Sequence, residues 1–451
     1  MRRLLIALAP LLLTGSLLAP ANAGVGAPPL PGLSITTDNV EHVGYLAEVG
    51  PTVSARVVTV DGQRRLYVSS IARGLSIYDI DDPENPTLIG LLPLGGWQNE
   101  DMAVSADGNI AVLAYGDTNQ YSFNWIIDTS DPANPQLIGQ TDGGDHTAEC
   151  VTPDCSWLYG SEGNIYDLSD PANPKTLSKT WIQHAKEQGV NVTGYPHKVV
   201  LDDAGYVITD SSPRVMFDIA DPANPRVVTS AVTRLPNTAN IQYQHNNLRP
   251  RAADWTPRTE EDPGGEALRP GELLLAGGET NLQPRCNGTN GPFMTWDMRD
   301  FDKGRQMTLA HTFRPLANGN YVDGNPAVNA VGCSNHWFDW SPDGDDYLVA
   351  TAWFEHGMRL LEVEAETGEI AEVGFFQPIN GSTGAAYWID DEYLYTTDYV
   401  RGIDILKIDR DPENRPSQEE LDANWLANAD LPRLPATQAE LYLCTIGRTR
   451  R

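Results

Sequence analysis

The sequence is poor in positive charge, in cysteine and in long apolar runs. Its 31 Lys and Arg residues stand against 61 Asp and Glu residues, which gives a formal net charge of −30. Such an excess of negative charge argues against nucleic acid or an anionic membrane as the partner. It is typical of a solvated surface, a salty environment or a cation-binding role. The one long apolar run lies at the N-terminus and is too short to cross a bilayer, so no membrane span is predicted.

The N-terminus has the pattern of a secretory signal. Arg2 and Arg3 form a basic start, residues 4–18 are apolar, and Ala21-Asn-Ala23 offers small residues for cleavage. Residues 1–23 are therefore predicted to be a signal peptide, and residues 24–38 an N-terminal extension of the mature chain. We expect the protein to be secreted, either to the periplasm or to the extracellular space.

Common catalytic motifs are missing. The sequence has no Gly-rich phosphate loop and no HExxH, GxSxG or CxxC pattern. Its five cysteines, in a secreted chain, indicate disulfides. Cys150 and Cys155 bracket a hairpin turn and form one candidate pair, Cys286 and Cys333 form a second, and Cys444 is left over. Spacing alone does not determine this connectivity.

A turn motif returns along the chain, each time after a β-rich run that ends in Asp. Its copies are Asp79-Ile-Asp-Asp82-Pro-Glu-Asn85-Pro86, Asp128-Thr-Ser-Asp131-Pro-Ala-Asn134-Pro135, Asp167-Leu-Ser-Asp170-Pro-Ala-Asn173-Pro174, Asp218-Ile-Ala-Asp221-Pro-Ala-Asn224-Pro225 and the degenerate Asp409-Arg-Asp411-Pro-Glu-Asn414-Arg-Pro416. Asp and Asn bond to nearby backbone in turns, and Pro fixes φ there. The motif is therefore predicted to be structural. Its spacing indicates one structural unit used many times.

Each unit holds four short β-runs, which is the content of a propeller blade. The third runs number seven, at residues 75–79, 125–128, 165–167, 215–218, 293–297, 359–364 and 403–408. The last unit lacks a fourth run, and residues 41–48 match the missing one. The predicted fold is all-β: a seven-bladed β-propeller of four-stranded blades over residues 39–416, closed by an N-terminal strand that completes the last blade.

Two segments interrupt or follow this pattern. Blade five is predicted to be enlarged by an insertion near residues 249–292: residues 249–270 are rich in Arg, Glu, Pro and Gly, and residues 281–292 form a second long loop. Residues 417–451 are predicted to form a helix and a tail, because Ser417-Gln-Glu-Glu420 has the pattern of a capping box.

The runs Gly74-Leu-Ser-Ile-Tyr-Asp79 and Gly402-Ile-Asp-Ile-Leu-Lys-Ile408, with the turns that follow them, resemble the LVIVD-repeat β-propeller proteins of bacteria. The resemblance covers about residues 39–416. It implies a propeller that resides outside the cytoplasm, and it implies no established reaction. Units five and six depart from the repeated turn.

Aligning the units brings polar residues to two shared positions. At the start of the first run stand Ser54, Glu100, His146 or Thr147, His197, His245, His336 and Thr383; at the end of the second run stand Asp117, Glu162, Asp210, Glu279, Glu355 and Asp398. First strands line the axis of a propeller, so the four His side chains are predicted to converge near the mouth of the central channel. Glu100 and the other carboxylates are expected to surround them.

This ring admits two interpretations. Neutral imidazoles bind Zn, Cu or Fe, while the carboxylates orient them from behind or bind a harder cation such as Ca. Alternatively, the side chains satisfy one another and axial water. We expect a monomeric binding or interaction module that meets an unknown protein or small-molecule ligand through its axial His/acid face. The alternatives are a metal-dependent enzyme, either oxidase or hydrolase, with His146, His197, His245 and His336 as ligands, and a purely structural envelope protein.

Overall fold

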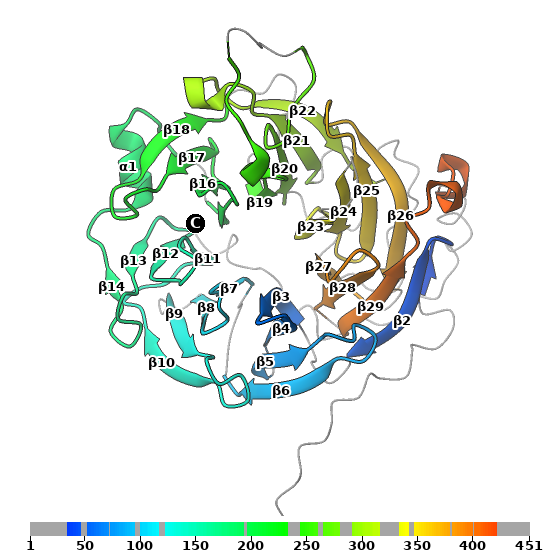
Figure 1. The fold of residues 1–451 in the computed structure, drawn as a ribbon, viewed down its shortest axis with the longest axis horizontal. Helices are drawn as coiled ribbons and strands as arrows, with labels where there is room; N and C mark the ends of the chain where they lie inside the picture. Colours follow the sequence, from blue (N-terminus) through cyan, green and yellow to red (C-terminus); the bar gives the residue numbers. More distant parts are fainter. Residues whose placement is uncertain are drawn as a thin grey trace, which may run out of the picture.

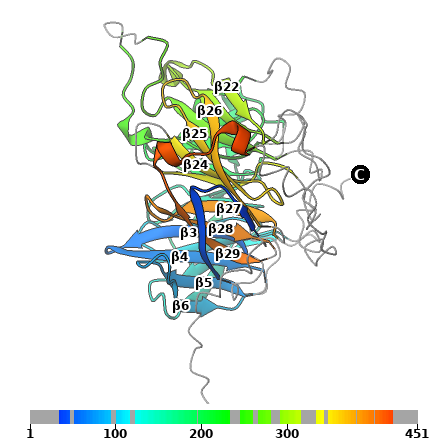
Figure 2. The ribbon, with the colours of Figure 1, turned by 90° about the vertical axis from the view of Figure 1, so that its right-hand side faces the viewer.

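Seven antiparallel sheets surround a central axis, as the predicted propeller requires (Figure 1). The computed structural model describes residues 34–46, 52–71, 73–94, 100–116, 122–193, 196–232, 244–259, 265–279, 291–315, 333–341, 347–378, 381–399 and 401–421. In every blade the strands run antiparallel, and consecutive strands lie side by side from the axis to the rim. Figure 2 shows this order from the side for blade one.

The strand bounds follow the repeat. Blade one contains β3 (Thr52–Val60), β4 (Gln63–Ser70), β5 (Gly74–Asp79) and β6 (Thr87–Leu92), and blade two contains β7 (Met102–Val104), β8 (Ile110–Gly116), β9 (Ser122–Asp128) and β10 (Gln136–Gln140). Blade three contains β11 (Ala148–Cys150), β12 (Trp157–Gly160), β13 (Ile165–Asp167) and β14 (Lys175–Thr176), and blade four contains β15 (Val199–Leu201), β16 (Tyr206–Thr209), β17 (Val215–Asp218) and β18 (Arg226–Ser230). Blade five contains β19 (Gln244–Leu248), β20 (Leu273–Gly278), β21 (Phe293–Asp297) and β22 (Thr308–Phe313), blade six contains β23 (Phe338–Ser341), β24 (Tyr347–Ala352), β25 (Met358–Val363) and β26 (Ile370–Pro378), and blade seven contains β27 (Thr383–Trp388), β28 (Tyr393–Asp398) and β29 (Gly402–Ile408). All seven predicted third strands are present within a few residues.

The ring is closed by the N-terminal part of the chain. Strand β2 (Val40–Leu46) pairs antiparallel with β29, with Val40 opposite Ile408, and is the outermost strand of blade seven. This confirms the predicted closing strand. A shorter strand, β1 (Ser34–Thr36), pairs with β26 and adds a fifth strand to blade six. These three residues were predicted to lie in an extension outside the propeller, because they belong to no repeat.

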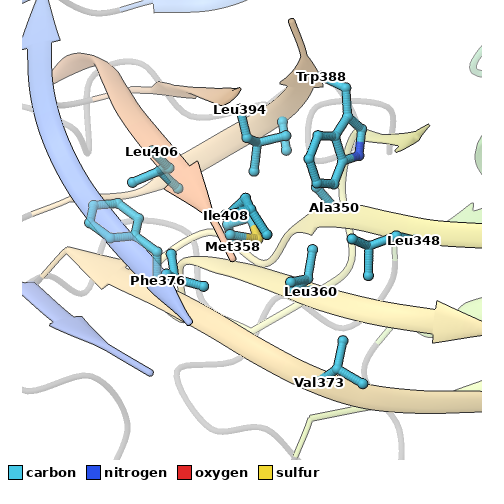
Figure 3. Close-up of a cluster of buried hydrophobic side chains, with 12 residues drawn as sticks. Leu348, Ala350, Met358, Leu360, Val373, Phe376, Trp388, Leu394, Leu406 and Ile408 are labelled. Atoms are coloured by element: carbon cyan, nitrogen blue, oxygen red, sulfur yellow. The ribbon is translucent and has the colours of Figure 1, made fainter. Parts of the chain in front are cut away.

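Apolar side chains fill the spaces between neighbouring blades. Between blades six and seven, Met358 and Phe376 lie against Leu406, and all three are buried (Figure 3). Trp388, the last residue of the innermost strand β27, belongs to the same cluster. Each blade is covered on both faces by its neighbours, so strands such as β24 and β28 are almost continuously buried. This packing makes the blades a rigid frame for residues at the axis.

The remaining described elements are short. Helix α1 (Trp181–Glu187) follows blade three and has a Thr180–Gln183 capping box; η2 (Ala252–Asp254), η3 (Phe301–Lys303) and η4 (Pro412–Asn414) are single 3-10 turns. The insertion of blade five lies between β19 and β20, where buried Arg258 binds Glu272 with Nε and Oε1 2.7 Å apart. Ser417 and Glu420 form the predicted capping box. Among the described residues, no helix is long and apolar enough to cross a membrane.

One predicted disulfide is present. Cys150 and Cys155 are bonded across the hairpin turn, with their Cα atoms 4.7 Å apart. Cys333 is also disulfide-bonded. Its predicted partner Cys286 lies outside the described residues, so that pairing stays a prediction.

Candidate metal centre

One position of the repeat brings five predicted residues to the axis. Glu100, His146, His197 and His336 each lie two residues before the first strand of their blade, and His245 is the second residue of β19. Figure 1 shows the first strands β7, β11, β19 and β23 closest to the centre of the ring. The shared position therefore explains why side chains from blades two to six converge.

Backbone hydrogen bonds hold these residues in register. The amide of His197 donates to the carbonyl of Asp210 at 3.0 Å, and the amide of His336 donates to the carbonyl of Ala352 at 3.0 Å. His245 lies at a β-bulge, since Gln244 is opposite Gly278 while Asn246 is opposite Gly277. A bulge redirects the side chain of the extra residue, and here it accompanies a histidine at the axis.

The four imidazoles surround the carboxylate of Glu100. His146 Nε2 contacts Oε2 of Glu100, and His336 Nε2 lies 2.8 Å from Oε1. His197 Nε2 is 3.8 Å from Oε2, and His245 Nε2 is 3.7 Å from Oε1. His146 Nε2 and His197 Nε2 are only 3.0 Å apart. None of the five residues is more than 5% exposed.

The contacts of His336 need a cation. Its Nδ1 contacts the carbonyl oxygen of Gly384. A carbonyl only accepts, so Nδ1 carries hydrogen and donates it. In neutral His336 the lone pair on Nε2 then faces a carboxylate oxygen, and two acceptors at 2.8 Å repel each other. Either a proton on Nε2 or a metal ion between the two groups resolves this. A backbone carbonyl behind the second ring nitrogen is the usual arrangement of a metal-bound histidine.

His245 is the least satisfied member of the cluster. Within the described part of the chain, neither of its ring nitrogens has a hydrogen-bond partner, although the side chain is completely buried. Buried polar groups normally have partners, so each exception calls for an explanation. A metal ion on Nε2 would satisfy one of the two nitrogens.

The protonation equilibria favour neutral imidazoles. Burial, followed by the charge of His336, lowers the pKa of His245 to about 3. Burial, followed by the charges of His245 and His146, holds the pKa of His197 well below its ordinary value. These two side chains are therefore neutral at pH 7, which is the form that binds metals.

One pair at the axis is charged. Burial acts to raise the pKa of Glu100, but His146, His245 and His336 together outweigh burial and hold this pKa well below its ordinary value. Burial acts to lower the pKa of His146, and the Glu100 carboxylate raises it overall. The cluster thus contains a charged Glu100–His146 pair next to the neutral imidazoles of His197 and His245.

The predicted acidic ring is only partly assembled around the histidines. Glu279 lies with Oε2 3.9 Å from His245 Nε2, and burial raises the pKa of Glu279 to about 7. Glu162 is solvent-exposed. Asp210 pairs with Arg214 at 2.7 Å and accepts from Asn247.

Two other acids of the predicted ring accept hydrogen bonds from residues outside the histidine cluster. Glu355 accepts a hydrogen bond from Ser382, and Asp398 accepts one from the amide of Arg401. Asp117 lies outside the described residues. Among the described acids only Glu100 and Glu279 fall within the groups whose donor atoms are close enough to share an ion.

A second charged layer was not predicted. Lys198, next to His197, contacts Asp101 and lies 2.9 Å from an oxygen of Glu149, which also binds Arg56 at 2.9 Å. The two cations balance the two carboxylates. The signal was present in the sequence, since Asp101 and Lys198 directly follow two of the aligned axial residues.

The donor set fits a transition metal. Imidazole nitrogens suit Zn, Cu, Fe and Ni, and a carboxylate adds a harder donor. Two ligands bonded to one ion at roughly 2.0–2.2 Å lie about 3–4 Å apart. The 3.0 Å separation of His146 Nε2 and His197 Nε2 falls in this range. The four histidines predicted as ligands are thus brought together, with Glu100 inside their ring rather than behind it.

Comparisons with known proteins support the fold and leave the site unassigned. No family model matches the chain, and no curated protein matches it. A solved structure of a protein from Lactobacillus plantarum matches 76% of this chain and 99% of its own, with a TM-score of 0.51 and 10% sequence identity. At that identity the likeness concerns the fold alone. The chain is a seven-bladed β-propeller with a buried His/Glu cluster at its axis.

Proposed function

We propose that this protein is a binding propeller whose ligand is a divalent first-row transition metal, bound at the axis by side chains of the cluster formed by His146, His197, His245, His336 and Glu100. The observation that carries the proposal is His245. It is fully buried, and neither ring nitrogen has a hydrogen-bond partner in the described part of the chain. Its Nε2 and three other imidazole Nε2 atoms face one carboxylate.

Elemental analysis tests this proposal. Protein without an affinity tag should retain a transition metal in stoichiometric amount, or take it up after reconstitution with Zn, Cu, Fe(II), Ni or Mn. His245→Ala should retain less metal than the wild type, and His311→Ala, which alters a partly exposed histidine of β22, should retain as much as the wild type. A folded wild-type protein that binds none of these ions at stoichiometric level would overturn the proposal.

Catalysis by the bound ion is the second candidate function. Each group of donor atoms close enough to share an ion contains three protein atoms. A catalytic metal needs a coordination position that the protein leaves open. Metal-dependent turnover of ester, phosphoester or O2 substrates, present in wild type and absent in His245→Ala, would favour this candidate over simple binding.

We also propose that the protein is secreted and belongs with the LVIVD-repeat propellers. Residues 1–23 carry the signal pattern, and a disulfide between Cys150 and Cys155 suits an oxidising compartment. N-terminal sequencing of protein recovered from outside the inner membrane tests secretion. A mature chain that starts near Gly24 is the expected result, and an intact Met1 in the cytoplasm contradicts it.

A further inference from the structure

Three groups of donor atoms at the axis are close enough to share an ion, and two of these groups have only Glu100 in common. Glu100, His146 and His197 form one set, and Glu100, His245 and His336 form the other. The two oxygens of Glu100 serve different sets: Oε2 is the nearer contact of His146 and His197, and Oε1 that of His336 and His245. A carboxylate placed in this way between two pairs of imidazoles has the arrangement of a bridging ligand.

The cluster is too wide for one ion to use all its donors. Among the described residues, no group whose donor atoms lie within 4.8 Å of one another contains both His146 and His336. Opposite ligands of one ion with bonds of about 2.0–2.2 Å are at most roughly 4.4 Å apart. One ion in the middle would also have to displace Glu100, which fills the space between these two histidines. Two ions would leave Glu100 where it is.

We propose that the axial cluster is a dinuclear metal centre in which Glu100 bridges two divalent transition metal ions. His146 and His197 hold the first ion, and His245 and His336 hold the second. Two-metal sites place their ions about 3.5–4 Å apart, a separation that one carboxylate spans. This inference rests on the proposed metal-binding function and adds the number of ions and the division of the ligands.

Glu279 supplies a further donor on one side. Its Oε2 lies 3.9 Å from His245 Nε2, and its Oε1 is buried without a hydrogen-bond partner in the described part of the chain. It also shares a donor group with His197 and His245. A second carboxylate beside His245 offsets part of the charge that two divalent ions bring into a buried site. We therefore assign Glu279 to the ion held by His245 and His336.

Stoichiometry is the primary test. Metal-free wild-type protein is titrated with Zn(II) or Co(II), and bound metal is measured after removal of the excess. Two ions per chain is the expected result. One ion per chain overturns the dinuclear centre and leaves the proposed function standing, whereas no bound ion overturns both.

Single variants test how the ligands divide. His146→Ala and His336→Ala should each lower the capacity from two ions to one. Glu279→Gln should weaken one of the two binding steps by about 10–100-fold, a range typical of lost supporting carboxylates. Glu355→Gln is the matched control, because Glu355 is a buried acid of the predicted ring outside every donor group, and it should leave both steps unchanged. Equal loss of both ions in both histidine variants contradicts the division.

A third test uses only the wild-type protein, so its result does not depend on whether a variant folds. Two Cu(II) ions bridged by one carboxylate couple magnetically. The integrated paramagnetic resonance signal should therefore fall below the amount of bound copper once the second equivalent is added. A signal that stays proportional to bound copper up to two equivalents means that the ions are isolated, and it overturns the Glu100 bridge.

Discussion

The outer turns and the axial ring occupy fixed positions of the same repeat, yet they use it in opposite ways. At the outer turns, similar residues make the same bonds in blade after blade. Asp131 Oδ2 accepts from Asn134 Nδ2 at 2.8 Å, and Asp82 Oδ2 accepts from Asn85 Nδ2 at 3.0 Å. The same pair of groups recurs at Asp221 and at Asp170. The Asp–Asn bond of each of these four copies lies within its own turn.

At the axial ring, the repeat supplies the position and the residues differ. Blades two to six place one carboxylate and four imidazoles there, and these side chains meet across the axis rather than within a turn. They are buried, and His245 has no hydrogen-bond partner in the described part of the chain. Repeated identity therefore identifies structure in this protein, and departure from identity at a shared position identifies the candidate site.

Metal removal should produce the largest difference between the two regions. A ligand present at about 1,000 times its dissociation constant adds about 4 kcal/mol to the free energy of unfolding. Denaturant unfolding with and without a chelator should show a shift of this order for wild type. Asn134→Ala should keep the shift, since it alters only an outer turn, and His245→Ala should reduce it, since it removes one ligand of the site. An unchanged wild-type curve would mean that the axial ring is as purely structural as the turns.

The sequence predicted most of the fold because the repeat sets the register. The Asp-Pro-x-Asn-Pro turns located the ends of the third strands, and the missing fourth strand of blade seven pointed to residues 41–48. Strand β1 was missed because three residues without a repeat carry too little pattern. Its position depends on pairing with β26, far away in the sequence.

The sequence predicted which residues lie at the candidate site, but it did not predict how their side chains are arranged. The register placed His146, His197, His245 and His336 at the axis, because first strands line it. It could not show that Glu100 lies between them, since distances across the ring depend on side-chain conformation. Nor could it separate Glu279 from Asp210, whose charge is taken up by Arg214 four residues later.

Acid should lower the stability of the region beside the axial ring, because that region contains a buried histidine, and it should affect the outer turns less. His356 lies in the turn after β24, near Phe354, whose ring contacts His336. Burial, followed by the charge of Arg359, lowers the pKa of His356 to about 3. The unfolded chain therefore binds this proton at higher pH than the folded chain does. The stability that neutral His356 contributes is complete above about pH 6.5 and is lost as the pH falls toward 3.

Between pH 7 and pH 4 this loss amounts to about 3 kcal/mol. His356→Gln should reduce the pH dependence of the unfolding free energy by about that amount. His311→Gln removes a partly exposed histidine and serves as the control. If both variants change the pH dependence equally, burial at the face of the site has no special role.

Close packing at the rim gives a smaller effect. A β-carbon on Gly139 of β10 would lie 2.4 Å from the carbonyl oxygen of Pro171, in the turn of the next blade. Gly139→Ala should therefore lower the unfolding free energy by about 1–3 kcal/mol through overpacking. Gly143→Ala, where the added atom meets nothing within 4 Å but φ is +100°, separates backbone strain from packing. Metal content should stay at the wild-type level in both variants.

The smallest effects should come from the turn bonds, and their equality is the informative result. Asn85→Ala, Asn134→Ala and Asn224→Ala each remove one exposed side-chain hydrogen bond of 2.8–3.0 Å. A typical bond of this kind contributes about 1 kcal/mol, so the three unfolding free energies should fall by similar small amounts. Variants at the axial ring should differ among themselves, because each histidine has different partners. Three unequal turn variants would show that these turns have also diverged in role, and would remove the basis for treating identity across blades as a sign of structure.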